Sequence, residues 1–204
     1  MADQKRTLDT LEIIGGALCL NFANTLNSRL DTEHDYLRTY PDLTGWTARL
    51  GVLPPEQLAR LGTLAAQDPH QAETALREAV DLRELLYRLF ASAARQTESR
   101  REDLDAFILW WGEAVAHGQL SRRENGYTLD WSAAQDLKAP LWPVVHSAGE
   151  LLLSRELAQV KECPGCGWLF LDTSKNRSRR WCSMNTCGVS DKMRRYYRKS
   201  QQVT

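Results

Sequence analysis

Hydrophobic residues in the middle of the chain follow the period of an α-helix. After Asp68-Pro69 they recur at steps of three and four residues, at Ala72, Leu76, Ala79, Val80, Leu86, Leu89, Phe90 and Ala93. This spacing places them on one face of an amphipathic helix. Asp68 is a good capping residue and proline suits the first helical position, so we expect the helix to begin at Pro69. The segment PPEQLARLGTLAAQ before it predicts another helix.

Two further patterns in this part of the chain predict β-hairpins. In QLSRRENGYTLDW, residues 119–131, Asn125-Gly126 separates two alternating stretches, which is a strong hairpin signal. In LEIIGGALCLNF, residues 11–22, Gly15-Gly16 separates two short apolar runs and also predicts a pair of strands. For residues 1–160 we therefore predict a mostly helical domain of the α+β class with small β-hairpins.

Charge is divided unevenly along the 204 residues. Of 26 basic and 26 acidic residues, 10 basic and 3 acidic lie in residues 161–204, a net of +7, which leaves 16 and 23, a net of −7, for residues 1–160. Such an asymmetry predicts a basic module joined to an acidic body. We expect two domains with these bounds, and a polyanion as the partner of the second.

Four of the five cysteines lie in the basic module, in two closely spaced pairs: Cys163-x2-Cys166 and Cys182-x4-Cys187. Pairs with these gaps are typical of structural zinc sites, in which each pair forms a tight turn that directs both thiolates at one ion. Gly167 can adopt the positive φ that such a turn often requires. Four thiolates fill a tetrahedral shell, so we predict one structural Zn²⁺. An iron–sulfur cluster, disulfides and free thiols are the alternatives.

Around the metal ligands, the pattern predicts strands, a turn and a helix. Trp168–Leu171 is expected as one strand, Thr173–Arg177 as a polar turn, Arg179–Trp181 as the returning strand and Asp191–Lys199 as a helix. This order suggests a treble-clef-like or ribbon-like zinc module, which is too small to fold without its ion.

Basic residues give this module its charge. The eight that we expect to contact nucleic acid are Arg177, Arg179 and Arg180 on the hairpin and Lys192, Arg194, Arg195, Arg198 and Lys199 on the helix. The planar guanidinium group suits phosphate oxygens and guanine edges. On the other side of the helix, Met193, Tyr196 and Tyr197 are expected to pack on the metal-binding turns.

Two stretches resemble known bacterial sequences. FLDTSKNRSRRWCSM, residues 170–184, followed by Cys187-Gly188, Lys192 and Arg195, resembles the CGNR-type zinc finger. LCLNFANT, residues 18–25, resembles the opening motif of the helical ABATE domain, which precedes this finger in that family. The resemblance implies a regulator of transcription that binds DNA, in a family of which some members are linked to stress responses.

The chain departs from the family pattern at two places. The Cys-Gly-Asn-Arg that names the finger reads Cys187-Gly188-Val189-Ser190 here, so an Asn-Arg pair is missing. Asn21 stands where many members carry Asp, which removes a carboxylate and argues against acid–base or metal chemistry there. Asn21 and Asn24 are candidates for binding a ligand, but the role that we favour for both is structural, such as stabilisation of the adjacent turn.

No recognised catalytic motif is present. The chain lacks G-x-S-x-G, H-E-x-x-H and a phosphate-binding glycine loop, and its four histidines are scattered. We therefore expect no enzyme activity and no catalytic residues. The start, MADQKRTLDTLE, lacks the pattern of a signal peptide, and no apolar run approaches the roughly 20 residues of a membrane span. We expect a cytoplasmic protein without membrane contact.

The function predicted from these observations is regulation of transcription through DNA binding by a structural zinc finger with four cysteine ligands. RNA binding by the same surface, with Trp181 or Tyr197 stacking on bases, is one alternative. A protein–protein adaptor with a structural zinc module is the other. For residues 1–160, a small-molecule effector and a homodimer remain open.

Overall fold

The computed structural model describes residues 7–30 and 34–201, with side chains as far as residue 196. Its helices are α1 (Leu18–Ala23), α2 (Tyr40–Arg49), α3 (Pro55–Gln67), α4 (Pro69–Ala94), α5 (Arg101–His117), α6 (Trp142–Leu153) and α7 (Val189–Gln201). Its strands are β1 (Gln119–Arg123), β2 (Gly126–Asp130), β3 (Val160–Glu162) and β4 (Leu169–Leu171). Short 3-10 turns lie at Leu8–Thr10, Ala139–Leu141 and Arg155–Gln159, and a wide helical turn at Met184–Gly188.

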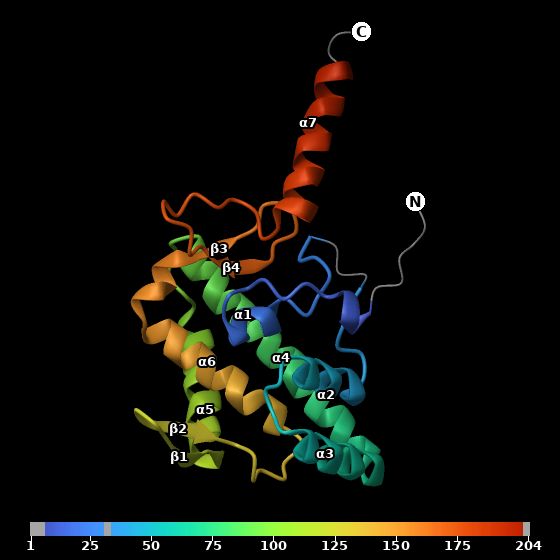
Figure 1. Cartoon of the computed structure of the whole chain (residues 1–204), viewed down its shortest axis with the longest axis vertical. Coiled ribbons are helices and arrows are strands. Elements are labelled where there is room, and N and C mark those ends of the chain that lie inside the picture. Colours follow the sequence, from blue (N-terminus) through green and yellow to red (C-terminus); the bar gives the residue numbers. More distant parts are fainter. Residues whose placement is uncertain (1–6, 31–33, 202–204) are drawn as a thin grey trace.

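The mostly helical α+β fold predicted from the sequence is confirmed. Helix α4 runs through the centre of the body (Figure 1), and it begins at Pro69 as expected, with the Asp68 carboxylate accepting a hydrogen bond from the Gln71 N–H at 2.9 Å. Its apolar face is buried, including Leu82, Leu86 and Phe90. In the described part of the chain, no helix combines the length and apolarity needed to cross a membrane.

The hairpin predicted around Asn125 is confirmed. Strands β1 and β2 pair antiparallel, with Arg123 opposite Gly126, so the connecting loop is Glu124-Asn125. Gly126 has φ +140°, a conformation that side chains strongly disfavour. In Figure 1 this hairpin lies at the end of α5, far from β3 and β4.

The hairpin predicted for residues 11–22 is wrong, because this segment forms α1 instead. The Gly15 N–H donates to the Asn21 side-chain oxygen at 2.8 Å, and the Gly15 carbonyl accepts from the Leu171 N–H at 2.9 Å. Gly16 has φ +83°, and a Cβ there would lie 3.1 Å from Leu171 Cβ. The two glycines therefore allow the chain to approach β4, and α1 that follows is almost fully buried against α4 and α6. A short buried helix and a short buried strand look alike in sequence.

The strand pairing predicted within the zinc module is also wrong. Strand β4 forms where a strand was expected, but it pairs with β3, with Val160 opposite Leu171 and Glu162 opposite Leu169. Residues 179–181 form no strand. Both strands pack on α4, and β4 also contacts α1. One continuous cluster of buried side chains includes residues of the helical body and of the module, and the boundary at residue 160 stays a prediction.

Helix α7 projects away from the rest of the molecule (Figure 1) and starts at Val189, two residues before the predicted helix. Its main contact is the wide turn at residues 184–188. Packing of its apolar side chains on the metal-binding turns was expected and is wrong for two of them, since Met193 is 48% exposed and Tyr196 68%. The side chain of Tyr197 lies outside the described residues.

Candidate metal centre and basic surface

The four cysteines of the module converge on one point. The sulfurs of Cys163, Cys166, Cys182 and Cys187 all lie within 4.8 Å of one another. The Cys166–Cys182 and Cys182–Cys187 sulfur separations are 3.5 and 3.7 Å. Four sulfurs placed tetrahedrally at about 2.3 Å from zinc are roughly 3.8 Å apart, so this cluster fits one Zn²⁺. All four positions of the shell would be filled by the protein, which is the arrangement of a structural ion.

The first pair of cysteines is held by a tight turn. The Gly167 N–H donates to the Cys163 carbonyl at 2.8 Å, and the Cys163 N–H donates to the Trp168 carbonyl at 2.8 Å. Gly167 has φ +75°, as the sequence suggested. A Cβ on Gly165 would lie 3.2 Å from the Cys187 sulfur, so this glycine allows the turn to approach the second pair.

The chemistry of these thiols favours a bound cation. Hydrogen bonds from Cys166 and Cys182 lower the pKa of Cys163, and the bond to Cys163 raises the pKa of Cys166. Without a cation, the four neighbouring thiols therefore do not all ionise, whereas a divalent metal holds all four as thiolates. Cys19, in the body, is different: burial raises the pKa of this thiol to about 12, so it stays protonated.

Residues 24–29 of the body form hydrogen bonds with the first metal-binding turn and the start of β4. Asn24 is buried, and its side chain both donates to the Leu169 carbonyl at 2.8 Å and accepts from the Leu169 N–H at 2.9 Å. The Trp168 indole donates to the Leu26 carbonyl at 2.7 Å, and the Arg29 N–H to the Cys166 carbonyl at 2.7 Å. The metal-binding turn is thus hydrogen-bonded to a body segment some 140 residues earlier in the chain.

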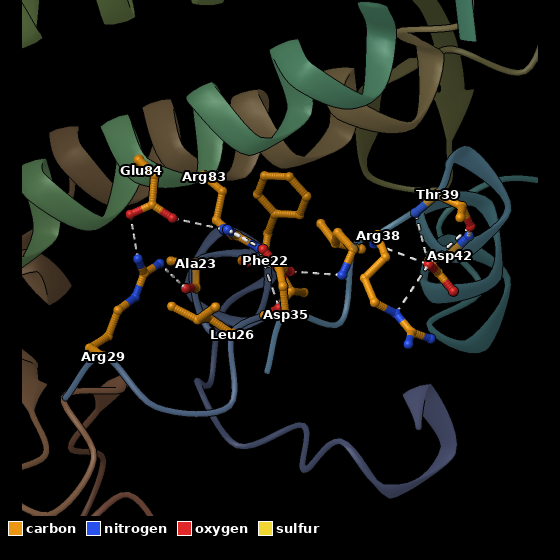
Figure 2. A network of polar contacts seen from close by, with 12 residues as sticks. Phe22, Ala23, Leu26, Arg29, Asp35, Arg38, Thr39, Asp42, Arg83 and Glu84 are labelled. Carbon is orange, nitrogen blue, oxygen red and sulfur yellow. Dashed lines mark hydrogen bonds and ion pairs between the residues drawn. The ribbon is translucent and has the colours of Figure 1, made fainter. Parts of the chain in front are cut away.

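A partly buried network of ion pairs, in which the arginines are buried and the acids are partly exposed, holds residues 24–29 on α4. Arg29 donates a hydrogen bond to Glu84 at 2.5 Å, and Arg83 donates two to Asp35 at 2.6 and 2.8 Å. These side chains are drawn in Figure 2. Arg83 also contacts Glu84 at 2.9 Å, which joins the two pairs. The Arg29 guanidinium lies 4.0 Å from the centre of the Tyr87 ring. Its neighbours therefore restrict Arg29, whose backbone holds the metal-binding turn.

A second connection runs from α4 to the residue before Cys163. Glu162 accepts hydrogen bonds from the Tyr87 hydroxyl at 2.9 Å and from Arg95 at 2.6 and 2.8 Å. Burial and the bond to Glu162 raise the pKa of Tyr87 to about 12, so the hydroxyl remains a donor at neutral pH. These contacts align β3 with α4.

Asp172 organises the polar loop between the cysteine pairs. It is 0% exposed and accepts hydrogen bonds from Lys161 Nζ at 2.6 Å, from the Ser174 hydroxyl at 2.5 Å and from the Arg179 N–H at 2.9 Å. Burial alone would raise the pKa of Asp172, but the bonds from Lys161 and Ser174 hold it well below its usual range. Lys161 Nζ also donates to the Arg177 carbonyl at 2.5 Å. The loop therefore wraps around a carboxylate, which explains why it does not return as a strand.

Replacing Asp172 with alanine is expected to loosen this loop. The donors of Lys161, Ser174 and Arg179 would lose the one carboxylate that they share, and with it the hydrogen bonds that hold the two ends of the loop together. Limited trypsin digestion of the zinc-loaded protein should cut after Lys175 or Arg177 several-fold faster than in the wild type. The stabilisation needs the carboxylate, so it is present above about pH 4 and is lost as the pH falls through the lowered pKa. Unchanged cleavage at these bonds would contradict the role assigned to Asp172, with D105A, at an exposed position, as the control.

The predicted nucleic-acid residues divide into one inward-pointing arginine and several exposed ones. The Arg179 guanidinium donates to the carbonyls of Trp181, at 2.9 Å, and Cys182, and lies 4.6 Å from the Phe170 ring centre. Arg179 therefore braces the second metal-binding turn. Arg180 is exposed and lies 4.7 Å from the centre of the Trp181 ring.

A hollow of about 330 Å³ brings three of these arginines together: Arg180 from the loop, and Arg194 and Arg195 from α7. Trp181 and Asp191 also line it, and Asp191 pairs with Arg195 at 2.8 Å. The other predicted contacts are spread out. Arg177 and Lys192 are exposed outside the hollow, and the side chains of Arg198 and Lys199 lie outside the described residues.

The two asparagines predicted as ligand-binding candidates both bond to the protein itself. Asn24 is 2% exposed, and both the NH₂ group and the oxygen of its side-chain amide are hydrogen-bonded to the Leu169 backbone. Asn21 holds Gly15 at the start of α1. These contacts support the structural role that the sequence analysis favoured, and ligand binding by either residue stays a prediction.

Sequence comparison with known families now adds to this geometry. Residues 159–200 match the CGNR zinc finger, which covers all four converging cysteines. Residues 16–155 match the family described as "Putative stress-induced transcription regulator", ABATE. The chain belongs to this ABATE family. Its resemblance to the CGNR and ABATE sequences is thus confirmed, and neither description is that of an enzyme. No curated protein matches the chain.

Several residues that build the ABATE–finger junction were not singled out from the sequence: Arg29, Arg83, Lys161, Glu162 and Asp172. Asp172 lies inside the finger motif, so the resemblance could have pointed to it. Arg83 carries a weaker signal, because a charged residue on the apolar face of a predicted helix must have a partner when buried. For Arg29, Lys161 and Glu162, we find no signal in the sequence that would separate them from surface charges.

Proposed function

We propose that this ABATE-family protein regulates transcription by binding duplex DNA with its zinc-built finger. The observation that carries the proposal is the convergence of Arg180, Arg194 and Arg195 around one hollow at the base of α7. Three guanidinium groups gathered on one side favour phosphate oxygens, which they contact through paired hydrogen bonds. The charge of +7 on residues 161–204, from 10 basic and 3 acidic residues, supports the same partner.

In this proposal the metal is structural and the body holds the finger. Cys163, Cys166, Cys182 and Cys187 bind one Zn²⁺, which fixes the two turns that carry the arginines. Residues 24–29 and α4 orient the first turn, and the acidic body keeps polyanion contact local to the finger. The protein carries out no reaction. A homodimer and a small-molecule effector of the body remain predictions.

A charge-removal experiment tests the proposal. The triple variant R180A/R194A/R195A should lose at least tenfold in affinity for duplex DNA while keeping its zinc, because the candidate metal ligands are the four cysteines. The matched control R77A/R123A/R155A removes the same charge from exposed positions of the body and should bind nearly as the wild type does. Equal affinity of the two triple variants, measured by fluorescence anisotropy, would reject the proposal.

If the proposal is rejected, RNA binding and a role as a protein adaptor are the functions that remain to be tested. Base stacking on Trp181 is disfavoured, because this residue is 8% exposed and the Arg180 guanidinium lies over its ring. A protein that binds neither A-form RNA duplex nor DNA, yet retains a partner from nuclease-treated lysate, would fit the adaptor.

A further inference from the structure

A second hollow adjoins the one at the base of α7, and it lies between the body and the finger. Its volume is about 600 Å³, and Pro164 and Arg180 line both hollows. The walls of this junction hollow come from the finger and from the end of α4, where Arg95 directly follows the helix. Helix α4 ends beside β3 (Figure 1), within residues 16–155 that match the ABATE family. One side of the junction hollow therefore belongs to the body.

Positive charge predominates in the junction hollow. Its lining includes one acidic residue, Glu162, and four basic ones: Arg95, Lys161, Arg179 and Arg180. Two of the four are engaged within the finger. Lys161 is paired with Asp172, and the Arg179 guanidinium donates to two backbone carbonyls. The donors that remain for a ligand are therefore to be found on the other lining residues.

Three side chains of the junction hollow keep hydrogen-bond donors that the described part of the chain does not use. Arg95 binds the Glu162 carboxylate through Nε and Nη2, at 2.6 and 2.8 Å, which leaves its Nη1 free, and its side chain is 58% exposed. Ser178 is exposed, and its hydroxyl forms no hydrogen bond to a described residue. The Arg180 guanidinium lies over the Trp181 ring and forms no ion pair with a described residue.

The position of these donors beside the first hollow indicates which anion they meet. Guanidinium and hydroxyl groups are typical donors to the phosphates of DNA. Duplex DNA presents its phosphates in a row along each strand, so a strand that contacts Arg194 and Arg180 in the first hollow places further phosphates in the second. Arg180 lines both hollows and is the point at which the two groups of contacts meet.

We propose that the row of phosphate contacts extends from α7, past Arg180, to Ser178 and Arg95, so that the ABATE body itself contacts DNA through the end of α4. This inference rests on the proposed function, and it adds a residue of the body to a surface otherwise built by the finger. The contact lies at the edge of the body that adjoins the finger. It is made to the backbone and carries no base specificity.

The two members of the Arg95–Glu162 pair should have opposite effects on DNA binding. In R95Q one phosphate contact is lost, so the zinc-loaded full chain should bind a random duplex of about 20 base pairs roughly fivefold less tightly at about 100 mM salt, with a salt slope shallower by about 0.9. In E162Q a negative charge leaves the hollow and Arg95 is released, so affinity should rise. If Arg95 only held β3 on α4, both substitutions would weaken binding, because both break the same ion pair.

Two further variants complete the test. The matched control is R88Q, because Arg88 is an exposed arginine of α4 that is paired with Asp103 in the same way, yet lines neither hollow. Its DNA affinity should equal that of the wild type. S178A leaves the Arg95–Glu162 pair intact and should weaken binding roughly threefold. The zinc content of every variant is measured alongside, and one equivalent is expected in each.

Failure of the inference and failure of the proposed function give different results. If R95Q and S178A bind as the wild type does, or if E162Q is weakened as much as R95Q, the body makes no phosphate contact, and sensitivity to R180A/R194A/R195A then confines DNA binding to the finger. Absence of wild-type binding to the duplex at low salt would reject the proposed function and the inference with it.

Discussion

Replacing one zinc-ligand cysteine is expected to unfold the finger while the helical body keeps its helices. In C182S, the cluster would lose one thiolate of four, and structural zinc in finger peptides contributes about 10–16 kcal/mol of apparent binding free energy at neutral pH. Strands β3 and β4 have three residues each, which is too few to hold the module together without the ion. Removal of zinc by a strong chelator should have the same effect on the wild type.

Two measurements check this expectation. The zinc content after desalting should fall from one equivalent to well below one, and amides of residues 163–188 should lose protection against hydrogen exchange. The matched control is C19A, which changes the fifth cysteine, buried in α1 of the body, and should keep one equivalent of zinc. Full zinc content in C182S, or unchanged protection after chelation, would contradict a metal centre built from these four residues.

The second large effect is expected at the junction between body and finger. In N24A, the N–H and carbonyl groups of Leu169 would stay buried without partners, since Leu169 is itself fully buried. Each orphaned group costs about 1–3 kcal/mol, so we expect unfolding to become easier by about 3 kcal/mol. For a protein of this size, that corresponds to a decrease in Tm of roughly 6–12 °C.

The variant N21A is the matched control for this prediction. Asn21 accepts one hydrogen bond from Gly15 and is only partly buried, so its loss should cost about 1 kcal/mol. Hydrogen exchange gives a further readout, because the Leu169 amide should exchange faster in N24A and normally in N21A. A Tm of N24A within 2 °C of the wild type would show that Asn24 does not join finger and body.

The parts of the structure that could be predicted from the sequence depend on local spacing. The cysteine pairs were found because ligand spacing within a tight turn is a local property. Helix α4 was found because its apolar positions recur with the helical period from Ala72 to Ala93, over about six turns. The hairpin β1–β2 was found because its turn residues are local too.

The parts that could not be predicted depend on contacts between residues far apart in the sequence, or on the direction in which a side chain points. Strand β4 was recognised, but its partner β3 was not. The segment before β4 and the segment after it, residues 179–181, could each form the second strand. The Gly15-Gly16 pair was read as a turn, whereas it allows close approach to Leu171. Arg179 was grouped with its neighbours because arginine suits phosphates and backbone carbonyls equally well. Sequence also gave no indication that Met193 would remain exposed, since amphipathicity does not reveal whether a helix is covered.

The structure connects the two parts of this ABATE-family protein through a small set of contacts. Asn24 and Arg29 hold the first metal-binding turn, and the pairs Arg29–Glu84 and Arg83–Asp35 hold the segment that carries them. A change in the body that moved residues 24–29 would therefore reach the metal-binding turn directly. This connection is the structural basis on which a role of the body in regulation can be examined.

The measurement that tests the central claim most directly is the salt dependence of DNA binding by the zinc-loaded protein and by R180A/R194A/R195A. Affinity for a duplex of about 20 base pairs would be measured between about 50 and 200 mM salt. Each phosphate contact contributes about −0.9 to the slope of log K against log salt. The account predicts a wild-type slope of roughly −4 and a slope shallower by about 2–3 in the variant. No binding at about 50 mM salt, or equal slopes for both proteins, would contradict it.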